Sequence, residues 1–196
     1  MPEYDDSLTL REALAIYFEA NGFGDDGGYS DTWVYGKFGP VPFAFPNTPA
    51  RRRAVPLHDI HHVVTGYDTD GVGEGAIGAW EVASGCERHW VAWLLDLNAM
   101  AIAFFLDWRA VWRGFKRGRR SRNYYTRSVD DALLATKLGT ARRELLCAPD
   151  DSGQCPSTLV DRATFVGWLA TGLLSIGLQV GLLLAPIAWL AWWLAA

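Results

Sequence analysis

The last 34 residues of the chain, from Ala163 to Ala196, include no charged side chain. As one helix this segment would be about 51 Å long, whereas about 20 apolar residues suffice to cross the hydrocarbon core of a bilayer. Two spans joined by a turn would need more residues. We therefore predict one membrane-spanning helix over about 163–184, a kink at Pro186, and tryptophans 189, 192 and 193 at the far interface. A buried core or oligomer helix is the alternative.

Basic residues lie on only one side of this predicted span. Arg142, Arg143 and Arg162 precede it, and no lysine or arginine follows it. Because loops rich in lysine and arginine stay on the cytoplasmic side, we expect the folded part on the cytoplasmic face of a bacterial inner membrane. In a eukaryote the equivalent place is the matrix face of the mitochondrial inner membrane.

The rest of the chain has helical periodicity and helix start and stop signals, with no convincing strand pattern. We predict an all-α domain over 1–148, a polar linker over 149–162 and a hydrophobic membrane anchor over 163–196. Residues 22–56, rich in glycine, proline and aromatic side chains, are predicted to form an ordered loop. The helices expected in the domain span about 10–20, 56–65, 69–84, 87–112 and 128–146. In the fourth, Asp96 and Asn98 favour a core helix over a second span.

Charge and cysteine usage exclude two classes of protein. The net charge is −4, and no nucleic-acid-binding motif accompanies the basic residues. Cys86, Cys147 and Cys155 form no CxxC pair, which argues against a thiolate zinc site. Seven bases gather within 113–127, and we interpret this segment as a loop. It is either ordinary solvated surface or a contact with anionic headgroups, in which case its aromatic residues would lie at the membrane interface; these are Phe115, Tyr124 and Tyr125.

The candidate site is a group of imidazoles and carboxylates. On a helix, His58 and His62 share one face and Asp59 lies at its edge, since these residues are three or four positions apart. A turn at 66–69 would fold the next helix back and place Glu74 opposite His62. Nitrogen and oxygen ligands without thiolate suit one divalent zinc, iron or manganese ion. His61 points away and is expected to be structural, and a solvated, histidine-rich cap is the alternative for the whole group.

The string His-Asp-x-x-His, eleven residues and Glu, formed here by His58, Asp59, His62 and Glu74, resembles the signature of the Coq-four family of coenzyme Q (ubiquinone) biosynthesis. The resemblance covers about residues 35–147. It implies a helical, membrane-associated protein in which these four residues hold the metal. It also implies a role in ubiquinone synthesis, where the ring carboxylate of a prenylated precursor is removed with oxidation at that carbon.

Two functions follow from these observations as expectations. The first is a metal-dependent decarboxylase or oxygenase, lyase-like in outcome, that acts on a prenylated quinone precursor or another isoprenoid lipid. The second is a non-catalytic, lipid- or quinone-binding accessory subunit that docks on other subunits of a membrane complex. An apolar channel for the prenyl chain would be lined by aromatic residues, unless these pack in the core; the candidates are Trp80, Trp90, Trp93, Phe104 and Phe105.

Overall fold

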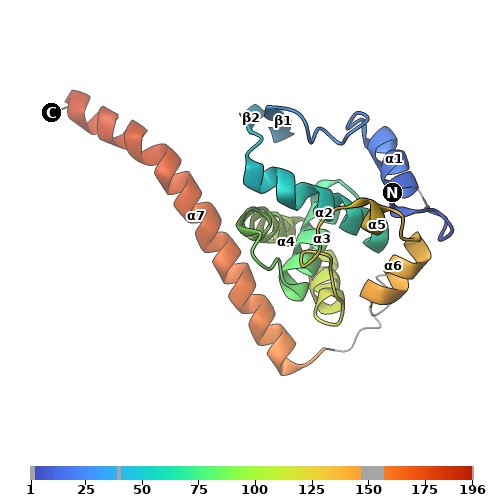
Figure 1. The fold of residues 1–196 in the computed structure, drawn as a ribbon. Coiled ribbons are helices and arrows are strands. Elements are labelled where there is room, and N and C mark those ends of the chain that lie inside the picture. The colour runs from blue at the N-terminus through green and yellow to red at the C-terminus, as the bar shows by residue number, and fades with distance from the viewer. Residues whose placement is uncertain (1–2, 39–40, 147–156, 196) are drawn as a thin grey trace.

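A computed structural model describes residues 3–38, 41–146 and 157–195. The described residues form seven helices and one small antiparallel sheet, which confirms the all-α prediction (Figure 1). The elements are α1 (Leu10–Asn21), β1 (Trp33–Phe38), β2 (Val41–Pro46), α2 (Pro49–Thr65), α3 (Gly71–Ser84), α4 (Trp90–Gly118), α5 (Asp131–Leu134), α6 (Leu138–Leu145) and α7 (Leu159–Ala195). Most of the predicted linker lies outside the described residues, and its last four residues already belong to α7.

The hairpin of α2 and α3 carries the candidate site. Gly66 ends α2 in the left-handed conformation (φ 80°), and the Asp70 carboxylate caps the first amide groups of α3, as predicted. The predicted start of the first arm at Pro56 is wrong, because Thr48 caps α2 and Pro49 occupies its first turn. Pro56 lies inside the helix instead.

The helix predicted over 87–112 continues to Gly118 and is broken inside. Asp107 has non-helical backbone angles (φ −151°, ψ 88°), and its carboxylate accepts hydrogen bonds from the amides of Arg109 and Ala110. Asp107 therefore caps a second helical segment. Both segments of α4 pack so closely on α3 that the glycines at the two contacts have no room for a side chain. A Cβ at Gly75 would overlap Ala103, and one at Gly114 would overlap the Ala76 carbonyl.

The single helix predicted over 128–146 is wrong, because α5 and α6 are separate. Between them the backbone pairs with the segment before α1: the amide of Leu10 donates to the Thr136 carbonyl, and the amide of Leu138 donates to the Leu8 carbonyl. These hydrogen bonds satisfy backbone groups that a continuous helix would have satisfied internally. With α1 and α2, the two short helices enclose the main apolar core, which includes Leu10, Tyr17, Leu57, Ile60, Leu133 and Leu138.

The proline-rich stretch contains a β-hairpin that the sequence analysis did not predict. Strands β1 and β2 pair antiparallel from Trp33 opposite Pro46 to Phe38 opposite Val41. A two-stranded sheet has only edge strands, which tolerate proline because one side of each strand needs no ladder hydrogen bonds. The buried amide of Asn47 fixes the preceding loop by donating to the carbonyls of residues 28, 29 and 31.

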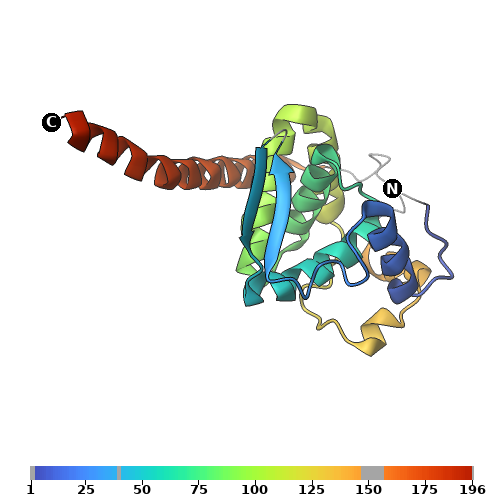
Figure 2. The ribbon, with the colours of Figure 1, turned by 90° about the horizontal axis from the view of Figure 1, so that it is seen from above.

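Helix α7 is a 37-residue rod that runs past the domain and extends beyond it (Figures 1 and 2). The predicted kink at Pro186 did not end the helix, which continues to Ala195. Its first half packs on α4, where Phe165 is buried and the ring of Trp168 stacks on that of Trp93 with centroids 4.9 Å apart. Further along, the amides of Asn98 and Gln179 exchange two hydrogen bonds of 3.3 Å.

Helices α4 and α7 are both long and apolar enough to cross a membrane, by length and composition. In α4 the break at Asp107 leaves two segments, 90–106 and 108–118, each shorter than the about 20 residues that a straight span needs. In α7, by contrast, leucines 174, 178, 182 and 183 are exposed along the rod. Helix α4 also exposes apolar side chains, among them Phe105 and Leu106, but it is partly buried against α3. Among the described residues, α7 is therefore the less covered of the two apolar helices.

Only the second part of the basic segment 113–127, after Gly118, is the loop that was predicted, and Arg122 and Arg127 are exposed there. The first part belongs to α4, and the Arg117 side chain is buried and donates to the Thr65 carbonyl at 3.0 Å. Phe115, Tyr124 and Tyr125 are also buried, so the prediction that they lie at a membrane interface is wrong.

The close contact of α3 and α4 generates a prediction about stability. Gly114→Val should reduce the free energy of unfolding by about 1–3 kcal/mol, because the new side chain meets the backbone of α3. Gly167→Val is the matched control, since a Cβ there has open space within 4 Å. Chemical unfolding of the full chain in detergent, followed by circular dichroism, measures both variants. Equal loss of stability in the two would contradict the close approach.

Candidate metal centre

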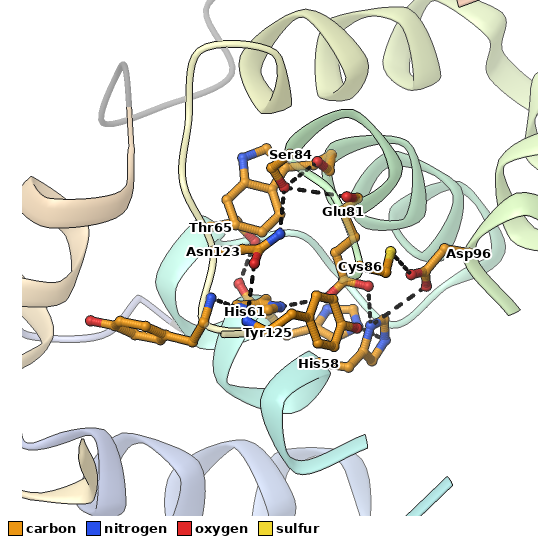
Figure 3. A network of polar contacts seen from close by, with 12 residues as sticks. His58, His61, Thr65, Glu81, Ser84, Cys86, Asp96, Asn123 and Tyr125 are labelled. Carbon is orange, nitrogen blue, oxygen red and sulfur yellow. Dashed lines mark hydrogen bonds and ion pairs between the residues drawn. The ribbon is translucent and has the colours of Figure 1, made fainter. Parts of the chain in front are cut away.

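Two imidazoles of α2 face each other at the centre of the site. The Nε2 atoms of His58 and His62 are 3.1 Å apart. The Nδ1–H of His62 donates to the Tyr67 carbonyl at 2.9 Å, and the Nδ1–H of His58 donates to the Glu81 carboxylate at 2.9 Å (Figure 3). Since each proton is held at Nδ1, both Nε2 atoms present lone pairs to each other. A cation between them, either a metal ion or a proton, is needed to make this arrangement favourable.

Glu74 from the first turn of α3 supplies the third donor. Its two carboxylate oxygens lie 3.3 Å from Nε2 of His62 and 3.6 Å from Nε2 of His58. One atom from each of these three side chains lies within 4.8 Å of the others. Ligands about 2.0–2.1 Å from a tetrahedral ion are about 3.3 Å from one another. The separations therefore fit a small divalent cation, as the spacing of these three residues predicts.

Asp59, the fourth predicted ligand, lies in the same cavity wall but outside this triad. It is buried, and its carboxylate accepts a hydrogen bond of 2.6 Å from the hydroxyl of Tyr29. Burial raises the pKa of the Asp59 carboxyl above its usual value, against the opposing effect of His58. A direct role for Asp59 in metal binding stays a prediction.

Glu81 is the functional residue that the sequence analysis missed. Its side chain is fully buried, and its two oxygens accept hydrogen bonds from Nδ1 of His58 and, at 2.5 Å, from Nδ1 of His61. The Nε2 atom of His61 accepts the backbone amide of Tyr124 at 3.0 Å. Both nitrogens of His61 are therefore engaged, which agrees with the structural role expected for it. The sequence signal that points to Glu81 is its spacing from Glu74: it follows seven residues later, two turns along the same face of α3.

A second group of donor atoms adjoins the triad. His58, Glu81 and Asp96 each offer an atom within 4.8 Å of the other two, and the Cys86 thiol donates to Asp96 at 3.3 Å (Figure 3). Because His58 belongs to both groups and its Nδ1 faces Glu81, we interpret this second group as the support of the first. A carboxylate behind a histidine ligand fixes the tautomer and raises the basicity of the ligating nitrogen.

The pKa shifts follow from this arrangement. Burial disfavours the charged form of His58, but the carboxylates of Glu81 and Glu74 outweigh it and hold the pKa of His58 well above its usual value. Burial also opposes ionisation of Glu74, and hydrogen bonds to His58 and His62 outweigh it, lowering the pKa of Glu74 to about 2. Without a metal, a proton on His58 thus occupies the position between the donors. Proton and metal compete for the same electron pairs.

A cavity of about 690 Å³ leads from these residues to the surface, a size typical of small-molecule sites. His58, Asp59 and Glu74 form part of its wall, and most of the other lining residues are apolar or aromatic. They come from α1 and the loop after it, the β-hairpin, α2 and the first segment of α4; examples are Phe23, Trp33, Val34, Leu95, Ala99 and Ile102. Phe23, Trp33, Leu95 and Ile102 are also substantially exposed, so the mouth of the cavity is apolar.

The aromatic residues expected to line a channel do not line this cavity. Trp80 is fully buried beside His61, and Phe104 packs on Phe165 of α7. Trp93 stacks on Trp168, whereas Trp90 and Phe105 are exposed. The first segment of α4 does face the cavity, but through smaller residues on a different side of the helix.

Comparisons with known proteins gave no relative of this chain. No family model, curated protein or solved structure matches it. The functional argument therefore depends on the geometry of the site.

The competition between proton and metal generates a pH prediction. The pKa of His58 in the folded state is raised above 6.5, so in the metal-free protein its stabilising effect is complete below that pH and is lost as pH rises through the raised pKa. Metal affinity should change in the opposite direction, increasing about tenfold per pH unit over the same interval. Unfolding in EDTA and zinc titration above pH 6.5 measure the two trends. His58→Gln should flatten the stability trend, and metal-free stability that increases with pH would contradict the assignment.

Proposed function

We propose that the chain is a metal-dependent enzyme of prenylated quinone synthesis, which processes an aromatic ring precursor by oxidative decarboxylation. The observation that carries the metal centre is the pair of Nε2 lone pairs held 3.1 Å apart with Glu74 beside both. The observation that supports a lipid-like substrate is the apolar mouth of the adjoining cavity. The spacing of His58, Asp59, His62 and Glu74 supports the assignment to the Coq-four family.

His58, His62 and Glu74 would hold one divalent zinc, iron or manganese ion, with Asp59 as a fourth candidate ligand. When bound, such an ion supplies Lewis-acid stabilisation of negative charge on the ring carboxylate or phenolate, and iron or manganese also supplies redox chemistry. Glu81 keeps the proton of His58 at Nδ1, and the Tyr67 carbonyl does the same for His62. Tyr17 stacks on the ring of His62 and limits its rotation.

The overall reaction balances with water and dioxygen as co-reactants. The ring carboxylic acid leaves as CO₂, a hydroxyl from water takes its position, and the two electrons released reduce dioxygen to hydrogen peroxide. The side chains that line the cavity would exclude bulk water from the prenyl chain and orient the ring toward the triad. Asp59, held by the Tyr29 hydroxyl, is placed to accept a proton from a ring hydroxyl.

We further propose that α7 anchors the protein in a bacterial or mitochondrial inner membrane, with the domain on the cytoplasmic or matrix side. The exposed leucines along α7 and the absence of charge after Arg162 support this. The first segment of α4 borders both α7 and the cavity. A prenylated substrate would then reach the cavity from the lipid phase.

A non-catalytic accessory subunit that binds a lipid or quinone is the second candidate. It is favoured by the end of α7, where exposed Trp189, Trp192 and Trp193 offer a docking surface for other subunits of a membrane complex. Such a subunit needs the apolar cavity but has no use for a metal. Metal analysis therefore separates the two candidates.

Metal content is the first test of the proposed function. The purified full chain should hold about one ion, measured by mass spectrometry of the metals, and His62→Ala and Glu74→Ala should hold almost none. Glu81→Gln should bind about 10–100-fold more weakly, because it weakens the contacts that orient His58 and His61 but leaves the three candidate ligands in place. Glu19→Gln, an exposed residue of α1, is the control.

The same variants decide between enzyme and accessory subunit. A prenylated hydroxybenzoic acid incubated with the metal-loaded wild type should release CO₂ in step with dioxygen uptake, and His62→Ala should abolish both. Negligible metal in the wild type, or turnover that is unchanged by His62→Ala, would overturn the enzyme proposal. A metal-free wild type that still binds the prenylated acid would support the accessory subunit.

A second prediction tests the anchor. Leu174→Asp with Leu178→Asp, two exposed residues near the middle of the predicted span, should shift the chain out of the alkali-resistant membrane fraction, because an acidic group at the centre of a span costs about 2.5–3.5 kcal/mol. The control, Leu159→Asp with Val160→Asp, changes two exposed residues before the predicted span and should leave the protein in the membrane. Equal retention of both double variants would contradict a span at this position.

A further inference from the structure

A second cavity, of about 510 Å³, lies apart from the metal triad. It is bounded by α2, the turn before α4 and the segment that follows α4. Its lining residues include four arginines, Arg52, Arg53, Arg88 and Arg127. Against these four positive charges the lining contains one carboxylate, that of Glu87. We name this space the arginine cavity.

Within the described ranges of the chain, the guanidinium groups of the arginine cavity form no ion pair with a carboxylate, since none of the four lies within 4.0 Å of a carboxylate oxygen in such a pair. Arg52 donates to the Asp31 carbonyl at 2.8 Å, and Arg127 lies over the ring of Tyr124. The side chains of Arg53 and Arg88 make no hydrogen bond or ion pair with the described part of the chain. All four arginines are exposed, so solvent screens their mutual repulsion, and their positive charge remains available to an anion in the hollow.

The remaining lining suits a phosphate-bearing ligand. Buried Leu57 and Tyr125 contribute apolar surface, whereas Thr126 and Ser128 add hydroxyl donors. Guanidinium groups match the oxygens of a phosphate with paired hydrogen bonds, and several of them together favour more than one phosphate group. The volume is sufficient for a diphosphate with part of the molecule that carries it.

We propose that the arginine cavity binds an anion carrying a phosphate or diphosphate group. It is distinct from the metal centre, because Tyr125 is the one residue that lines both cavities and its side chain is buried between them. The ring of Tyr125 contacts those of His61 and His89 with centroids 5.0 Å and 5.1 Å away. The ligand therefore needs no metal to bind, and the proposal does not depend on the proposed function.

The phosphate can belong to a soluble molecule or to a lipid headgroup. The rim supports a membrane source, because the Glu87 carbonyl accepts the indole N–H of Trp93, which stacks on Trp168 of α7. Trp168 lies near the start of the predicted span, where headgroups would be close to the cavity. The chemistry of recognition is the same for both sources.

The test uses the full chain in neutral detergent with EDTA, and inorganic diphosphate as the probe in isothermal titration calorimetry. We expect saturable binding of one diphosphate per chain that weakens with added salt. Arg53→Gln with Arg88→Gln should weaken it about 100-fold, since each charge-assisted hydrogen bond contributes about a factor of ten. Arg109→Gln with Arg143→Gln, two exposed arginines outside this cavity, should bind like the wild type. His62→Ala should also bind like the wild type, which separates this site from the metal centre.

Nanodiscs distinguish the two sources. If the natural occupant is a headgroup, discs containing phosphatidic acid should suppress diphosphate binding to the wild type, whereas discs of phosphatidylcholine alone should not. If it is a soluble phosphate ester, both discs should leave diphosphate binding unchanged. Absence of saturable binding in the wild type, or equal weakening in the two double arginine variants, would overturn the proposal.

Discussion

The buried carboxylate of Glu81 is the interaction on which the rest of the site depends. It receives hydrogen bonds from His58 and His61, which are three residues apart on one side of α2, and so joins α2 to α3 through two contacts. His61 in turn accepts the amide of Tyr124 and ties the segment after α4 to the same group. A fully buried charge is costly unless it is paired and hydrogen-bonded. The imidazoles outweigh the effect of burial and hold the pKa of Glu81 well below its usual range.

Local signals in the sequence predicted the parts of the fold that depend on few neighbours. Thr9 and Glu12 mark the start of α1, Gly66 and Asp70 delimit the hairpin turn, and their backbone roles are determined within four residues. Spacing also brought together three of the four predicted ligands, because His58 and His62 share a helix face and only one turn separates them from α3. Glu81 was not predicted because its spacing from Glu74 indicates only a shared helix face, whereas its importance lies in the tertiary contact with α2.

The wrong predictions about the fold also arise from tertiary contacts. Pro56 has the character of a residue in the first turn of a helix, but Thr48 and Pro49 start α2 earlier in the chain. Pro56 therefore lies inside α2, whose neighbouring residues Ala54 and Leu57 pack in the core. The chain leaves the helix after Ala135 and is extended at Lys137, where the segment before α1 offers backbone hydrogen bonds in place of those of a helix. A headgroup contact of the basic segment would place the aromatic residues near 115 and 124 at a membrane interface, yet they fill the core between helices. In each case a distant part of the chain decides the outcome.

The first segment of α4 connects the two unusual features of the molecule. One side of it contributes Leu95, Ala99 and Ile102 to the cavity that reaches the metal triad. Another side meets α7, through the reciprocal amide pair of Asn98 and Gln179 and the close contact of Gly172 with Leu97. The break at Asp107 lets α4 turn back along α3 after making both contacts. Under the proposed function, this apolar helix, which borders both the tail and the cavity, would keep the apolar mouth of the site beside the membrane from which an apolar substrate would come.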